Sequence, residues 1–394
     1  WQEQRLDESS NIQFGEGGAG TFSDGKLMTR INDGFCRVVL EEFVAHGAPK
    51  EILTAAKPHI GTDLLRKVVV AIRQEIVAMG GEVRFHTAAE DIITDNGKLF
   101  GIIANGEEIP CNCLILAPGN AARPLFTCCM ERGIAIEAKP FSVGARIEHP
   151  QEAIDHAMYG DYAGHPKLGH AEYQLSERET DTGRAVYTFC MCSGGVVVPA
   201  ASERETIVTN GMSFHARNGK NANAAVVVSV GGEDFGNDPR KAIAFQRELE
   251  ARAYAAGRPG GEYAAPAENI QSFLEGRGRL NIGRVQPTYD RGVVAADLGA
   301  LLPTELADTL RAGLRAYERK IAGYTAPEAI LTGLETRTSS PVRLKREENF
   351  ECAQLAGLYP CGEGAGYAGG IMSAAVDGLR VARAIISRYS PAEG

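Results

Sequence analysis

The sequence lacks both a long apolar run and an excess of positive charge. No stretch approaches the ~20 consecutive apolar residues that a membrane-spanning helix needs. The 41 lysine and arginine residues are outnumbered by 50 aspartate and glutamate residues, which leaves a net charge of −9. Phosphate groups of nucleic acids and anionic lipids repel a chain of this charge. We therefore expect neither nucleic acid nor membrane to be a partner.

The sequence also lacks the cysteine patterns of disulfide frameworks and zinc sites. It has nine cysteines, an odd number, and no C-x-x-C pair. Its eight histidines show no metal-ligand spacing, so no metal site is predicted. Residues 1–5 lead directly into polar sequence, without the apolar core of a signal peptide. These features favour a reduced, cytoplasmic protein.

Two pairs of cysteines have C-x-C spacing, Cys111/Cys113 and Cys190/Cys192. In an extended strand such side chains share one face, so we predict small buried thiols that serve packing. Packing is also favoured for Cys361, although it borders a glycine-rich turn and could lie near a cofactor. A G-x-S-x-G motif is absent, so the sequence gives no support for a Ser-His-Asp hydrolase.

Glycine, in contrast, is abundant at 46 of 394 residues, about 12% against ~7% in average proteins. Residues 358–375 read as a short apolar strand, a glycine-rich turn and a small-residue helix. Glycine lets backbone approach a ligand, and a helix start near Gly369 offers free N–H groups to an electron-rich group. Glu363, at the strand end, is placed to accept hydrogen bonds from sugar-like hydroxyls. A tightly packed helix start also needs glycine, but the adjacent acid favours a ligand.

Two stretches match G-x-G-x-x-G, Gly15–Gly20 and Gly364–Gly369. The dinucleotide fingerprint needs a strand before it, a helix after it and an acid ~20 residues further on within a βαβ unit. The first match lacks both flanking elements. The second is followed by the end of the sequence before another strand forms. Neither is predicted to be the pyrophosphate fingerprint.

Periodicity predicts one helix and several short strands in the first part of the chain. The helix is expected over 64–79, capped by Thr62-Asp63 and ended by Gly80-Gly81. The apolar run 113–117 predicts a strand that is buried on both faces of a parallel sheet. Further strands, joined by N-G turns at 96–97 and 105–106, are expected over 82–85, 91–94, 99–104 and 107–110.

From about residue 141 the sequence becomes rich in β-branched and aromatic residues. Strands are expected over 184–192, 195–198, 206–208 and 224–230, and helices over 239–256 and 303–321. The fold class predicted is α/β, or α+β overall. A mostly β substrate domain, 141–340, is inserted into an incomplete Rossmann-like domain made of 1–140 and 341–394.

Four blocks of the sequence resemble an uncharacterised family of bacterial FAD-dependent dehydrogenases. These are single-dinucleotide flavoproteins with a glutathione-reductase-like fold. The blocks are 11–26, 139–150, 189–195 and 335–343, together with the glycine run near the end. They follow one another in order along nearly the whole chain. In this family the fingerprint lies upstream of the position of Trp1, so we expect this chain alone to bind FAD weakly or not at all.

The resemblance implies a set of cofactor-binding residues. Pro118 departs from the family pattern and removes a backbone donor, and Asn120 stands where the family leads us to expect histidine. Ala89 matches a position whose backbone meets the adenine, and Glu363 matches an acid on the ribitol. The full set is Gly15, Glu16, Gly17, Gly18, Thr21, Ser23, Asp24, Gly25, Lys26, Ala89, Ala117, Gly119, Gly362, Glu363, Gly369, Gly370 and Ile371.

Four residues are candidates for catalysis, each with a structural alternative. Lys26 is placed to stabilise a reduced flavin, or it is an ordinary loop lysine. Arg337 and Arg343 could clamp a substrate carboxylate, or form a network with Glu335 that holds the domains together. His215 is a possible proton donor, although a structural histidine is favoured.

The function that these residues imply is hydride transfer between flavin N5 and a small organic substrate or NAD(P)H. A small molecule, and an electron-transfer partner or NAD(P)H, are the expected partners. A dedicated NAD(P) domain is not expected, because there is no second fingerprint. The alternative is a non-catalytic binding or scaffold protein derived from a flavoprotein.

Overall fold

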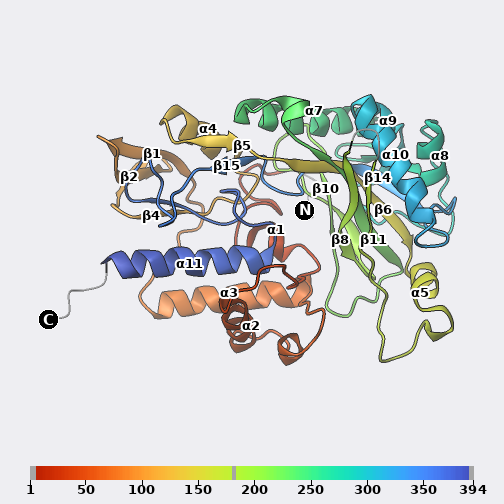
Figure 1. Ribbon diagram of the computed structural model, residues 1–394, viewed down its shortest axis with the longest axis horizontal. Coiled ribbons are helices and arrows are strands. Elements are labelled where there is room, and N and C mark those ends of the chain that lie inside the picture. The colour runs from red at the N-terminus through yellow and green to blue at the C-terminus, as the bar shows by residue number, and fades with distance from the viewer. Residues whose placement is uncertain (1–5, 180–182, 390–394) are drawn as a thin grey trace.

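A computed structural model describes residues 6–179 and 183–389 in two adjoining halves (Figure 1). One half holds a seven-stranded sheet, and the other holds small sheets above the long helices α3 (Thr62–Ala78) and α11 (Ile371–Tyr389). Residues 1–5, on which the expectation about a signal peptide rests, lie outside the described residues. The proposed domain boundaries at 140 and 341 stay a prediction.

The seven-stranded sheet has the order β13-β12-β14-β6-β11-β8-β7. Its central strands are β6 (Phe141–Pro150) and β11 (Asn221–Val230), which pair antiparallel along their whole lengths. The other strands are β7 (Ser176–Arg178), β8 (Ala185–Cys192), β12 (Ala265–Asn269), β13 (Val293–Ala295) and β14 (Ile330–Glu335). Every residue of β6 is buried, so both faces of the sheet are covered there.

The alternation of side chains along β6 gives the sheet one apolar and one polar face. Val143, Ala145 and Ile147 belong to a core that also contains residues of α7 (Pro239–Gly257) and α10 (Thr304–Glu318). Residues between them point to the opposite face, because successive strand residues alternate sides. Arg146 and Glu148 are therefore buried on the face away from that core.

The other half begins with a three-stranded antiparallel sheet of β1 (Ala89–Asp95), β2 (Lys98–Ala104) and β3 (Glu107–Pro110). Asn96-Gly97 and Asn105-Gly106 connect the strands, and all four residues have positive φ. Two consecutive positive φ angles are typical of the tight hairpin turns that N-G sequences favour. These strands and turns confirm the prediction from the sequence.

A two-stranded parallel sheet returns the end of the chain to its beginning. In it β4 (Leu114–Leu116) pairs with β16 (Leu358–Pro360), in register from Leu114/Leu358 to Leu116/Pro360. The parallel pairing confirms the expectation, but burial on both faces was wrong, because Ile115 is 45% exposed. Helix α11 follows β16 and packs with α2 (Phe35–Ala45) and α3 in one apolar cluster.

Three further expectations were wrong in detail. Residues 82–85 form no strand. In the described part of the chain, no neighbouring strand pairs with them through backbone hydrogen bonds, and the Phe85 side chain is 55% exposed. The strand expected over 206–208 begins later, as β10 (Thr209–Met212). Thr62 does not cap α3: the cap is Gly61, and the Thr62 hydroxyl donates to the Thr21 carbonyl.

The other predicted elements are confirmed with small shifts of their ends. Strands 184–192, 195–198 and 224–230 correspond to β8, β9 (Val196–Pro199) and β11. The remaining elements are α1 (Gly18–Thr21), η1 (Lys50–Leu53), α4 (Arg123–Glu131), β5 (Ile136–Ala138), α5 (Gln151–Tyr159), η2 (Gly160–Tyr162), α6 (Gly232–Phe235), η3 (Arg258–Gly260), α8 (Ile270–Glu275), α9 (Leu298–Leu301) and β15 (Val342–Leu344). Among residues 6–179 and 183–389, no helix has the length and apolarity that crossing a bilayer requires.

One buried carboxylate joins the two halves. Glu250 of α7 accepts hydrogen bonds from both Arg123 of α4 and Arg337, which follows β14. Glu250 is completely buried and Arg123 almost so. Burial alone would raise the pKa of Glu250, but the two guanidinium groups outweigh it and hold the pKa at about 2. Such a pair is costly to break, because a lone buried charge remains.

We predict that Glu250→Gln lowers the free energy of unfolding at neutral pH by about 3–5 kcal/mol, measured by urea denaturation. The pKa of Glu250 lies below its unfolded value, so the stabilisation is complete above about pH 4.5 and is lost as the pH falls towards about 2. The free energy of unfolding of the variant should therefore fall less steeply as the pH is lowered from about 4.5 towards about 2. The control Glu41→Gln removes an exposed pair with Arg37 and should leave the urea midpoint unchanged. Equal midpoints for both variants would contradict the account.

Candidate functional site

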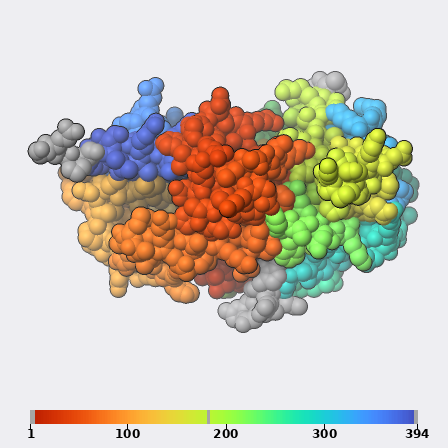
Figure 2. Space-filling model, turned by 90° about the horizontal axis from the view of Figure 1, so that it is seen from below, coloured from red at the N-terminus to blue at the C-terminus, as the bar shows by residue number. Residues whose placement is uncertain are grey.

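The two glycine runs that resemble nucleotide motifs lie against each other in the structure. A Cβ added to Gly20, the last glycine of the first run, would lie 3.2 Å from Cγ1 of Ile371, the first residue of α11. The second run ends just before this residue. Figure 2 shows the N-terminal part of the chain, red to orange, across the junction between the two halves. Two segments about 350 residues apart in the sequence thus lie next to each other in the fold.

The turn after β4 and the turn after β16 are in close contact. A Cβ added to Gly364 would lie 2.1 Å from the Gly119 carbonyl oxygen, so only glycine fits there. Gly119 itself has φ +73°, a value that side chains rarely tolerate. The amide of Cys361 donates to the Leu116 carbonyl at 2.9 Å and continues the parallel pairing into the turns. The two strand ends therefore present their loops at one edge.

Glu363 lies at this edge and pairs with Asn120. The Asn120 side-chain nitrogen donates to Oε1 of Glu363 at 2.7 Å. Burial raises the pKa of Glu363, and the hydrogen bond from Asn120 and the charge of Lys139 lower it in part. The Asn120 Oδ1 is buried without a hydrogen-bond partner among the described residues, and Glu363 Oε2 has no donor there either. Two acceptor oxygens are therefore available to a ligand.

The N-terminus of α11 is open. Gly369 and Gly370 are exposed, and a Cβ on either would meet nothing within 4 Å. The first hydrogen bond of the helix joins the Ala374 amide to the Gly370 carbonyl. The amides just before Ala374 are therefore unpaired within the described chain, apart from Gly369, which donates to the Ser373 hydroxyl. An open helix start of this kind attracts electron-rich groups.

The loop 15–26 is held by contacts at several positions, while its first residue, Gly15, has open space around it. The Ser23 hydroxyl donates to the Gly20 carbonyl and accepts from the Gly25 amide, and the Thr21 carbonyl accepts from the Thr62 hydroxyl. Gly17 has φ +78° and precedes the short helix α1, whereas Glu16 forms an ion pair with Arg73 of α3. The loop is thus fixed to α3, while Gly15 and Gly17 remain exposed.

Asp24 ties this loop to the other half of the molecule. Its buried carboxylate accepts hydrogen bonds from the Ser213 hydroxyl and from Arg217, whose Nε lies 3.0 Å from Oδ1. Arg217 also pairs with Glu172, and Glu172 lies 3.6 Å from the Lys26 ammonium group. The contacts of Asp24 therefore position Lys26 at the junction rather than in solvent.

The four candidate catalytic residues have different surroundings. Arg337 is almost fully buried, and its guanidinium donates to Glu250 and to Ser202. Arg343 is 42% exposed and lies beside the glycine run, with Nε 3.4 Å from the Gly366 carbonyl. Arg337 therefore forms a structural ion pair, as the alternative expected, but its partner is Glu250 and not Glu335.

His215 and Lys26 both contact His59. The rings of His215 and His59 stack with centroids 5.3 Å apart, and His59 forms an isolated β-bridge with Lys26. The His215 Nδ1 lies 3.0 Å from the Ile60 carbonyl oxygen. These contacts fit a histidine that fixes the loop, and its role as a proton donor stays a prediction.

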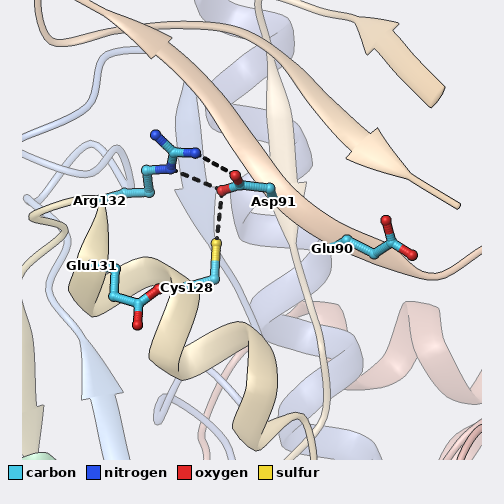
Figure 3. A pocket seen from close by; sticks show the side chains of 5 residues that line it. All are labelled: Glu90, Asp91, Cys128, Glu131 and Arg132. Carbon is cyan, nitrogen blue, oxygen red and sulfur yellow. Dashed lines mark hydrogen bonds and ion pairs between the residues drawn. The ribbon is translucent and has the colours of Figure 1, made fainter. Parts of the chain in front are cut away.

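The residue expected near the adenine lies at the start of the three-stranded sheet. Ala89 is the first residue of β1, next to a hollow of about 270 Å³ that Figure 3 shows from close by. The hollow is lined by Glu90, Asp91, Cys128, Glu131 and Arg132. Asp91 pairs there with Arg132, which keeps the pKa of Asp91 well below its usual range. Three carboxylates make the hollow a poor place for phosphate.

Two neighbours of Glu363 were missed by the sequence analysis. The Ser340 hydroxyl donates to the Gly364 carbonyl at 3.0 Å, and the Lys139 ammonium lies 3.4 Å from the Ser339 hydroxyl. Burial lowers the pKa of Lys139. Both residues enter the site because β5 pairs with β15, a contact that no local pattern indicates.

One protein-family model names a cofactor class for this chain. A family model described as FAD-dependent protein, C-terminal domain-like, matches residues 140–338, which span all strands of the seven-stranded sheet. A protein of Clostridium beijerinckii (strain ATCC 51743 / NCIMB 8052), described as uncharacterized, is 48% identical over 390 residues. The alignment covers 99% of this chain and 73% of that protein.

Similarity to solved structures is weaker. An oxidoreductase from Methanosarcina mazei has 13% identity and a TM-score of 0.35, covering 92% of this chain and 64% of that one. Glycine oxidase from Bacillus cereus ATCC 14579 has 11% identity and a TM-score of 0.32, covering 84% and 58%. CtdE in complex with FAD has 11% identity and a TM-score of 0.28, covering 81% and 59%. The chain spans less than two thirds of each structure's length, and TM-scores this low carry no argument.

The family match extends over half of the chain, and the Clostridium relative aligns with nearly all of it. FAD is the cofactor of the family that the model describes. The chain belongs to the family of FAD-dependent proteins, and residues 140–338 correspond to the C-terminal domain of that family.

Proposed function

We propose that this chain forms the flavin-binding side of an FAD-dependent oxidoreductase. The enzyme transfers hydride between the flavin and a small organic substrate or NAD(P)H. The observation that carries the proposal is the contact between the first glycine run and the start of α11, beside the unpaired acceptors of Glu363 and Asn120. Loop glycines, an open helix start and an acid for hydroxyl groups occur together there.

These features fit the ring and sugar-alcohol end of FAD. Glu363 and Asn120 would accept hydrogen bonds from ribityl hydroxyls, which supplies a partner for the buried Oδ1 of Asn120. The open amides of α11 would face an electron-rich edge of the cofactor. Gly15 leaves room for a flat ring, because a Cβ added to it would have no neighbour within 4 Å.

Bound FAD would supply two-electron chemistry, and this chain would position and polarise the reactants. Lys26 would place a positive charge at the junction, held there through Glu172 and Arg217. Arg343, exposed beside the glycine run, is the better placed of the two arginines to bind a substrate carboxylate. Arg337 would act as a structural residue, because Glu250 and Ser202 occupy its donors.

A non-catalytic binding protein is the second candidate. Within the described residues, no strand–glycine–helix unit is followed by a second parallel strand, so these residues alone would hold a flavin from the ring and ribityl side. A flavin held by one side only would bind weakly. The two candidates differ in whether bound flavin exchanges electrons with a substrate.

We predict that riboflavin and FAD bind this chain with dissociation constants within about threefold of each other, measured by quenching of flavin fluorescence. Riboflavin carries the ring and the ribityl chain, whereas ADP carries the adenine end. A large excess of ADP should therefore leave bound riboflavin in place and displace little FAD. Displacement of FAD by ADP, or a much tighter affinity for FAD than for riboflavin, would contradict the assignment.

We further predict that Glu363→Gln weakens riboflavin binding about tenfold, roughly 1.4 kcal/mol, because the charged acceptor is lost while the contact with Asn120 can persist. The same fluorescence titration measures it. The matched control is Glu348→Gln, which changes an exposed carboxylate on the same half and should bind as the parent does. Equal affinities for both variants would remove Glu363 from the site.

Anaerobic mixing of the flavin-loaded protein with NADH or NADPH separates the enzyme from the binding protein. The enzyme proposal expects bleaching of the flavin absorbance near 450 nm, or bleaching by a member of a panel of small organic acids and alcohols. The Lys26→Met variant should bleach more slowly, because the positive charge near the site is lost. A loaded protein that no reductant in the panel bleaches would favour the binding protein.

A further inference from the structure

A bulge in β8 brings two cysteines together on the polar face of the large sheet. The pairing of β8 with β11 shifts register between Asn223 and Ala225, where β8 carries one extra residue. Cys190 lies in this bulge with φ +45°, in the left-handed region that few residues other than glycine adopt. Cys190 is partly exposed and Cys192 is buried.

The bulge brings the two sulfurs within reach of each other. In a regular strand, residues two positions apart are separated by about 6.6 Å, close to the upper limit for a disulfide. A left-handed residue bends the strand and shortens this separation. The Cys192 thiol donates a hydrogen bond to the Cys190 carbonyl oxygen at 3.4 Å. The bulge thus places the Cys192 sulfur beside the backbone of Cys190.

Charged groups from three other segments face the pair. Arg146 of β6 is completely buried and donates to the Cys190 carbonyl at 3.0 Å, while it also pairs with Glu335 of β14. Lys26 and Asp24 of the N-terminal loop are the other charged neighbours. Positive charge at Arg146 and Lys26 favours a thiolate at Cys190, while Glu335 disfavours it.

The two thiols consequently differ in acidity. The hydrogen bond from Cys192 lowers the pKa of the Cys190 thiol to about 7, and Arg146 supports this shift against the opposing effect of burial. The hydrogen bond to Cys190 and burial raise the pKa of Cys192. Cys190 is therefore the more acidic of the two thiols, and Cys192 the one that keeps its proton. An accessible, ionised thiol beside a protonated one is the arrangement of a nucleophile and its resolving partner.

The chain contains a second C-x-C pair without these features. Cys111 and Cys113 are both partly exposed, and no residue from 111 to 113 has positive φ. Burial raises the pKa of both thiols. Spacing in the sequence is the same for the two pairs, so the difference lies in the bulge and the charges around Cys190. Cys111/Cys113 therefore serves as an internal control.

We propose that Cys190 and Cys192 form a reactive dithiol that reduces low-molecular-weight disulfides. The Cys190 thiolate attacks one sulfur of the small disulfide, whose S–S bond breaks, and the departing thiolate takes up a proton. The Cys192 thiol then gives up its proton and attacks the Cys190 sulfur, which releases the second small thiol. Two electrons pass from the protein to the disulfide, and the protein ends with a Cys190–Cys192 bond. The reaction needs no flavin and goes beyond the proposed function.

The test uses the unmodified chain and hydroxyethyl disulfide, followed by acid quenching, alkylation and peptide mass spectrometry. We expect an internal disulfide in the peptide that holds Cys190 and Cys192, and free thiols at Cys111 and Cys113. In Cys192→Ser, the mixed disulfide should accumulate on Cys190, whereas Cys190→Ser should show no adduct on Cys192. Absence of the internal disulfide, or equal oxidation of the pair at 111 and 113, overturns the proposal.

A second measurement needs no variant and no flavin. Iodoacetamide should alkylate Cys190 at pH 7 at least about threefold faster than Cys111, since the larger thiolate fraction outweighs the lower nucleophilicity of a more acidic thiol. A rate ratio near one also overturns the proposal. Failure here leaves the binding of riboflavin unaffected, and failure of riboflavin to bind leaves the thiol reactions unaffected, so the two proposals fail separately.

Discussion

The parallel pairing of β4 with β16 is the contact on which the candidate site depends. It brings residue 358 beside residue 114 and places both following turns at one edge of the small sheet. Gly364 can touch the Gly119 carbonyl only because Gly364 carries no side chain. Glu363 then meets Asn120, and α11 begins beside Gly20. Every ligand-facing feature of the site is set by this return of the chain.

Buried charges fix the second half of the molecule to that edge. Arg123, Arg337 and Glu250 form one network, and Asp24 with Arg217 forms another. Because these ions have little contact with water, each is stable only while its partners stay in place. The loop 15–26 is thereby held between α3 and the polar face of the large sheet. The same face carries Arg146, which donates a hydrogen bond to the Cys190 carbonyl.

Local patterns in the sequence predicted the elements that local rules determine. The N-G turns at 96 and 105, the helix α3 and the parallel character of β4 were all indicated by composition and spacing. The strand expected over 82–85 does not form, because a strand also needs a neighbour to pair with. Partners that depend on tertiary contacts, such as Asn120 for Glu363 and Glu250 for Arg337, leave no sequence signal. The bulge at Cys190 likewise comes from β8 pairing with β11 and not from C-x-C spacing.

Hydrogen–deuterium exchange with and without riboflavin tests most directly where the flavin lies. The account predicts slower exchange in residues 15–26, 117–120 and 362–374, where loop, turn and helix start meet. The three-stranded sheet formed by residues 89–110 should exchange at the same rate in both samples. Protection confined to that sheet, or protection nowhere despite bound flavin, would contradict the central claim.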